Sequence, residues 1–179
     1  MWGAGVRTAP LTSSLPMATP FRIYRILCST PPDLESERVV FESALSRCVE
    51  QVTMPQQVLF AAASFPPKFD ANRHRAAAEE NVRMCDFFLH IFSDTWPGAA
   101  FKAFIELAQV SQADPAQPMR QIAILFKDFA EADDKVRKYR ENLAAGGNCD
   151  IREFQDFTGL DRQFREILAS WWESVQAKP

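Results

Sequence analysis

The sequence predicts a single α/β domain in which helices cover both faces of a five-stranded parallel sheet of order 2-1-3-4-5. Two observations support this prediction. Apolar segments alternate with helical segments along the chain, and the strands expected at 86–93 and 121–129 contain nearly continuous apolar runs, Phe87 to Phe92 and Ile122 to Phe126. Strands that are apolar on both faces are typical of a parallel sheet buried between two helical layers. With 179 residues, the chain is long enough for one domain with a substantial core.

The first strand is expected at 21–28 and the first helix at 31–52. The apolar run stops at Ser29-Thr30, and an acidic segment with an apolar stripe at helical spacing follows. Thr30 is expected to cap this helix, with Pro31 at its first position and Asp33 in its first turn. Such a turn points backbone N–H groups at one spot beyond the strand. It is therefore either a ligand-binding turn or only a well-capped helix start.

The middle of the chain predicts two further strands and helices. The strand at 57–65 ends before two prolines, and the helix at 72–85 is polar and rich in Ala, Glu and Arg. The strand at 86–93 has a nearly continuous apolar character, and a short helix at 101–112 follows it. These elements continue the alternation of strand and helix.

The last third of the chain completes the pattern. A strand is expected at 121–129, and a charged helix at 130–145 ends at Gly146-Gly147. A weaker strand at 149–155 and a helix at 160–177 follow, with Trp171 on the apolar face of that helix. Trp172 is either core packing or part of a partner surface. Five strands connected in this way are typical of the flavodoxin-like topology, a three-layer sandwich.

Composition excludes several classes of function. The net charge is −3, and Arg73-His74-Arg75 is too short to be a nucleic-acid footprint. The longest apolar runs are far too short to span a membrane. Cys28, Cys48, Cys85 and Cys149 are expected to be reduced, buried thiols of a cytoplasmic protein.

Two further features concern the ends of the domain and its metal chemistry. Only two histidines are present, so no zinc site and no other metal site is expected, and His90 is expected in the core. Residues 1–20 contain small residues, three prolines and one charge, and residues 1–19 are expected to be a flexible segment. The domain is then expected to span residues 20–179.

The topology predicts where a ligand would bind. In an open α/β sheet, ligands bind beyond the carboxyl ends of the strands where the strand order reverses, here between the first and third strands. Ser29 and Thr30 are expected on one wall of that crevice, with Asp94 and Trp96 on the other. Asp94 could hold ribose hydroxyls or cap a turn, and Trp96 could stack on a base or cover the sheet edge.

Glu106 is the acid on the helix after the second of these loops. If it faces the crevice, partial burial would raise its pKa and equip it for acid–base or cation-stabilising chemistry. Periodicity alone favours the alternative, a surface residue of an amphipathic helix. Neither a dinucleotide-binding G-x-G-x-x-G motif nor a Walker motif is present, so classical redox chemistry and P-loop phosphoryl transfer are not expected.

Two segments carry a family resemblance. Ile26-Leu-Cys-Ser-Thr-x-x-Asp-Leu-Glu-x-Glu-Arg38 resembles the start of an uncharacterised bacterial domain family related to TIR domains. Cys85-Asp-Phe-Phe-Leu-His-Ile-Phe-Ser-Asp-Thr-Trp96 resembles the second signature of that family, a Cys-Asp strand before an Arg-containing loop. Thr95 stands where the family usually has that Arg, and Pro97 separates the aromatic residue from the glycine.

The resemblance implies a TIR-like domain of signalling or bacterial defence, with a more distant relation to nucleoside deoxyribosyltransferases. Glu106 matches the catalytic glutamate of these relatives. The implied activity is cleavage of the N-glycosidic bond of NAD, a related nucleotide or a nucleoside, without a further cofactor. A carboxylate would stabilise the oxocarbenium ion formed when nicotinamide or another base leaves. The alternatives are a non-catalytic module that self-associates or binds a signalling partner, and a nucleotide or nucleoside sensor without turnover.

Overall fold

The computed structural model describes residues 20–64, 70 and 73–177, so the segment 1–19 lies outside the described residues. The sheet has five parallel strands in the order β2-β1-β3-β4-β5. The strands are β1 (Arg22–Ser29), β2 (Val58–Ser64), β3 (Phe87–Phe92), β4 (Gln121–Lys127) and β5 (Asp150–Phe154). This order confirms the predicted flavodoxin-like fold.

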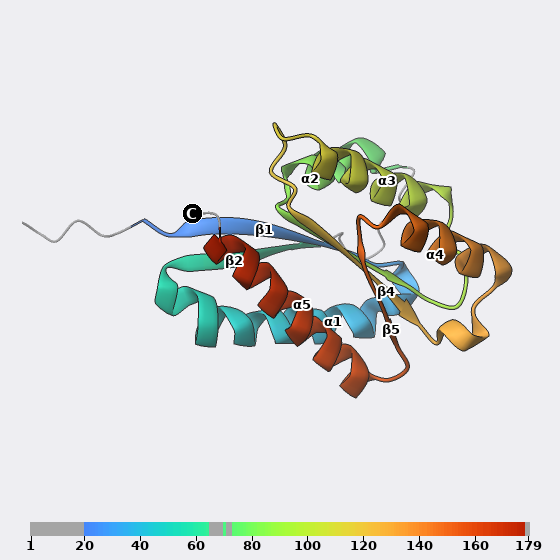
Figure 1. Ribbon diagram of the computed structural model, residues 1–179. Helices are drawn as coiled ribbons and strands as arrows, with labels where there is room; N and C mark the ends of the chain where they lie inside the picture. Colours follow the sequence, from blue (N-terminus) through green and yellow to red (C-terminus); the bar gives the residue numbers. More distant parts are fainter. Residues whose placement is uncertain (1–19, 65–69, 71–72, 178–179) are drawn as a thin grey trace, which may run out of the picture.

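The helices form the outer two of three layers. They are α1 (Glu35–Cys48), α2 (Arg75–Met84), α3 (Ala99–Ala113), α4 (Asp134–Gly146) and α5 (Phe157–Ala177). Figure 1 shows α1 and α5 on one face of the sheet and α2, α3 and α4 on the other. None of these described helices is long and apolar enough to cross a membrane.

The start of the first helix differs from the prediction. Pro31 has an extended backbone (ψ 155°), a 3-10 turn runs over Pro32–Leu34, and α1 begins only at Glu35. No side chain caps either element, so the expected cap at Thr30 is wrong. The reason is steric, because a residue before proline is excluded from the helical region, and Pro31 precedes Pro32.

The two faces of the sheet have separate apolar cores. On the α1–α5 face, Trp171 is fully buried and stacks on Phe87 with ring centroids 4.7 Å apart. On the opposite face, Phe92 stacks on Phe126 at 4.9 Å. Trp172 is only partly buried beside the first core. Alternate residues of β3 and β4 therefore supply both cores, as expected for a fully buried parallel sheet.

Candidate functional site

The carboxyl ends of the parallel strands meet at one edge of the sheet. Ser29 ends β1, Lys127 ends β4 and Phe154 ends β5, while the loop after β3 begins at Ser93. The strand order reverses between β1 and β3, so the predicted crevice would lie there.

Ser29 is held in the core at this point. It lies beside His90 in the β1–β3 register, and both residues are fully buried. Ser29 Oγ and His90 Nδ1 share a hydrogen bond of 3.0 Å, while His90 Nε2 has no partner among the described residues. Burial lowers the pKa of His90 to about 3, so the imidazole is neutral at pH 7. The prediction of a core histidine is confirmed.

Thr30 and Asp94 both lie nearer the surface. Thr30 is partly buried and follows the end of β1, and Asp94 is exposed. The backbone C=O of Asp94 accepts a hydrogen bond of 2.8 Å from the N–H of Asp133, the residue that caps α4. The β3–α3 loop is therefore joined to the start of α4.

Trp96 packs on the side of the sheet covered by α4. Its indole makes an edge contact with Tyr139 at 5.2 Å and stacks on Phe92 at 6.0 Å. This position matches the alternative in which Trp96 covers the sheet edge.

Glu106 lies on an exposed part of α3. Its side chain is 52% exposed and forms an ion pair of 2.8 Å with Lys102, one helical turn earlier. Burial, together with the nearby negative charge of Glu106, raises the pKa of the Tyr139 phenol on α4. Glu106 thus lies on the side of α3 that faces α4, whereas Ser29 is buried in the core. No described contact joins these two residues. The position is that of the surface glutamate that periodicity favours.

A partly buried ion pair at the same edge was missed from the sequence. Glu37 of α1 is only 2% exposed, and its carboxylate accepts a hydrogen bond of 2.7 Å from Lys127 Nζ. This bond raises the pKa of Lys127, and the charges of Asp128 and Asp94 act in the same direction. A signal was present, because Glu37 follows Leu34 by three residues and precedes Phe41 by four, on the apolar stripe of the helix.

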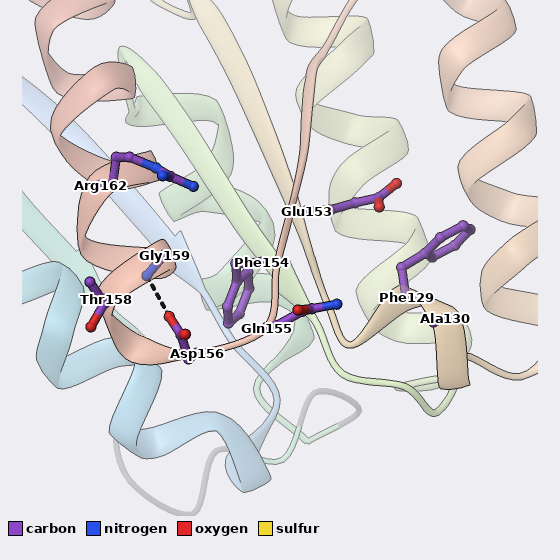
Figure 2. A pocket seen from close by; sticks show the side chains of 9 residues that line it. All are labelled: Phe129, Ala130, Glu153, Phe154, Gln155, Asp156, Thr158, Gly159 and Arg162. Atoms are coloured by element: carbon purple, nitrogen blue, oxygen red, sulfur yellow. Dashed lines mark hydrogen bonds between the residues drawn. The ribbon is translucent and has the colours of Figure 1, made fainter.

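Two hollows lie at this edge of the sheet, and the smaller one adjoins this ion pair. The smaller, about 240 Å³, is lined by Glu37 and Lys127 and by the β5–α5 connection, residues 154–157. The larger, about 420 Å³, shares that connection. Figure 2 shows the side chains that line the larger hollow: Phe129, Ala130, Glu153, Phe154, Gln155, Asp156, Thr158, Gly159 and Arg162.

The larger hollow combines both signs of charge. Arg162 and the first turn of α5 supply positive potential, whereas Glu153 and Asp156 are acidic. Asp156 Oδ1 accepts a hydrogen bond of 2.6 Å from the Gly159 N–H (Figure 2) and so occupies part of the helix start. Such a lining suits a polar ligand with hydroxyl groups. Within the described part of the chain, no group of three His, Cys, Asp or Glu side chains could hold a metal ion.

Comparison with known proteins gives no family assignment. No protein-family model matches the chain, and the search of curated proteins also finds no match. Among solved structures, the chain is similar to the metal-soaked Flv1 flavodiiron core from Synechocystis sp. PCC6803, with a TM-score of 0.41 and 11% identity. The match covers 86% of this chain and 37% of that chain.

Proposed function

We propose that this chain is a TIR-like signalling module that acts by binding a protein partner, without cleaving NAD. The two sequence motifs support the TIR-like character, and the flavodoxin-like sheet is compatible with it. One observation above all supports a non-catalytic role. Glu106, the residue that would have to act on the glycosidic bond, is half exposed and paired with Lys102.

The chemistry of glycosidic cleavage explains why the exposure of Glu106 argues against catalysis. A carboxylate stabilises a developing oxocarbenium ion most strongly in a site from which water is excluded. Glu106 is solvated, and its charge is already balanced by an ammonium at 2.8 Å. The hydroxyl of Ser29, expected to face the ligand, is buried against His90 instead.

The test is incubation of the purified protein with NAD over a wide range of protein concentration, followed by chromatography of the nucleotide. We expect intact NAD throughout, and we expect Glu106→Ala to keep the melting temperature of the parent protein. High protein concentration is included because activity of TIR-type enzymes depends on assembly. Release of nicotinamide that Glu106→Gln abolishes, in a variant that still folds, would show that the chain is a glycosidase.

A second candidate function is nucleotide sensing without turnover. The observation in its favour is the hollow of about 420 Å³ at the carboxyl edge, with Arg162 and Thr158 in its wall. A bound nucleotide would raise the melting temperature by mass action. Arg162→Gln should remove that rise, whereas Arg165→Gln, a change on the same helix outside the hollow, should preserve it.

A further inference from the structure

Strand β2 forms an open edge of the sheet. It pairs with β1 on one side, and no described strand lies on its other side (Figure 1). Its sequence, Val-Leu-Phe-Ala-Ala-Ala-Ser, has no charge and no proline. The opposite edge strand, β5, carries Asp150, Arg152 and Glu153, the charged residues with which natural edges avoid unwanted pairing. The two edges therefore differ in their capacity to accept another strand.

The direction of the unpaired backbone groups follows from the register. The N–H of Arg22 donates to the C=O of Gln57 at 3.0 Å, so Gln57 points towards β1. Because backbone groups alternate along a strand, the N–H and C=O groups of Phe60 and Ala62 point away from β1. These groups have the spacing that a further strand requires.

A hollow of about 350 Å³ lies beside this edge, between β2 and α1. Phe60, Leu45 and Val49 form its buried floor. Glu42 and Glu50 stand exposed at its rim. Glu42 pairs with Arg38, whereas Glu50 accepts a hydrogen bond of 3.3 Å from the hydroxyl of Ser46. The rim is thus acidic and the floor apolar.

We propose that the β2 edge binds an extended segment of a partner protein, in which basic and large apolar residues alternate, as a sixth strand of the sheet. The outward backbone groups of β2 would pair with this segment, as in strand-addition complexes. Its apolar side chains would enter the hollow, and its cationic ones would face Glu50. This inference rests on the proposed function and names the surface and the partner chemistry.

The acidic rim argues against a second copy of this chain as the occupant. Two copies paired through β2 across a two-fold axis would bring α1 of one beside α1 of the other. Glu42 and Glu50 of both copies would then approach one another, and like charges at an interface oppose association.

The test uses a fluorescent peptide of the length of β2, with lysine alternating with valine and phenylalanine, and a control peptide with glutamate in place of lysine. We expect the wild-type protein to bind the lysine peptide and not the glutamate peptide. Ala62→Pro, which removes one outward N–H at an edge that tolerates proline, should weaken binding about tenfold or more. Ala62→Gly keeps that N–H and should bind like the wild type.

Glu50→Lys provides an independent test at a surface position. It should weaken binding of the lysine peptide about two- to fivefold, with a smaller effect at high salt. Equal binding of both peptides, or equal binding by Ala62→Pro and Ala62→Gly, would overturn the inference. If the protein does not bind the peptide but forms a dimer that Ala62→Pro disrupts, the segment that pairs with β2 belongs to a second copy of this chain and not to a partner protein. Release of nicotinamide would contradict the proposed function and leave these peptide results unchanged.

Discussion

The carboxylate of Asp133 connects the start of α4 to the β3–α3 loop through Trp96. Asp133 Oδ2 accepts a hydrogen bond of 2.9 Å from the Trp96 N–H, and Oδ1 accepts one of 2.8 Å from the Val136 N–H. The bond from Val136, followed by that from Trp96, holds the pKa of Asp133 below its usual range. The loop is thereby fixed beside α4, and Trp96 covers the core there.

We therefore expect a graded loss of stability at Asp133. Asp133→Asn can still accept the bond from Val136 but not both bonds, and should lower the free energy of unfolding by about 1 kcal/mol. Asp133→Ala loses both and should cost about 2 kcal/mol. Urea denaturation at pH 7 measures both values. Asp134→Asn, a neighbouring exposed position, should change the free energy by a few tenths of a kcal/mol.

The same site predicts a dependence on pH. A lowered pKa contributes stability that is present above the unfolded value of about 3.9 and is lost as the pH falls through the folded value. The difference between the parent protein and Asp133→Asn should therefore shrink below pH 4. A difference that stays constant down to pH 2 would show that the carboxylate charge is irrelevant there.

Loss of the ion pair between Glu37 and Lys127 should lower the stability of the fold more than loss of the ion pair between Glu106 and Lys102. Lys127→Met leaves a buried carboxylate without its cation and should lower the free energy of unfolding by about 3 kcal/mol at pH 7. Lys102→Met removes an equally short but exposed partner and should cost less than about 1 kcal/mol. Equal losses in thermal or urea denaturation would contradict the structural difference between the two pairs.

The pH dependence of this pair has a definite sign. The raised pKa of Lys127 contributes stability that is fully present below about 10.4 and is lost as the pH rises through the folded value. The deficit of Lys127→Met relative to the parent protein should therefore be fully present at neutral pH and should shrink as the pH rises above about 10.4, which a series of denaturation curves would measure.

The buried, neutral His90 should make the folded protein less stable in mild acid. Its folded pKa is about 3, whereas a histidine in the unfolded chain has a pKa of about 6.5, so the unfolded state takes up the proton first. The stability contributed by neutral His90 should fall by about 1.4 kcal/mol per pH unit between these values. His90→Gln should remove this part of the slope, and His74→Gln, a change at the exposed histidine, should keep it. Identical slopes in the two variants would contradict this account.

The fold could be predicted because each buried strand leaves a strong local signal in the sequence. Segments such as 121–129 are apolar on both faces, which only a covered parallel sheet requires. The end of the helix at Gly146-Gly147 was also predictable, because glycine readily adopts the left-handed backbone that Gly147 has after α4 (φ +67°). The start of the first helix was predicted wrongly because Thr30 is a good cap in isolation, but the steric effect of Pro32 on Pro31 delays the helix.

The candidate site was harder to predict because its contacts join distant segments. Ser29 and His90 are 61 residues apart, and Glu37 and Lys127 are 90 residues apart. Topology places Ser29 at the correct edge of the sheet, but the side of the strand on which its hydroxyl lies depends on alternation through β1. Glu37 could have been recognised as an acid on a buried stripe, whereas its partner could be identified only from the packed structure.

The four thiols predict an order of chemical reactivity. Cys28 and Cys85 are 1% exposed, and burial raises the pKa of Cys85 to about 12 and that of Cys28 further. Cys48 and Cys149 are only partly buried, and their pKa values are also raised by burial. Because the thiolate is the reactive form, all four should react more slowly than a free thiol, and the two partly buried ones should react first.

Cys48 also lines a hollow of about 280 Å³ between α1 and α5, which gives a small reagent access to its sulfur. Alkylation with iodoacetamide at pH 8, followed by peptide mass mapping, should therefore detect Cys48 and Cys149 in the folded protein. Cys28 and Cys85 should appear only after urea is added. Cys48→Ser should remove one early modification and leave the rate at Cys149 unchanged. Early labelling of Cys28 would instead require opening of the core between β1 and α1, and hydrogen exchange at the β1 amides would detect that opening independently.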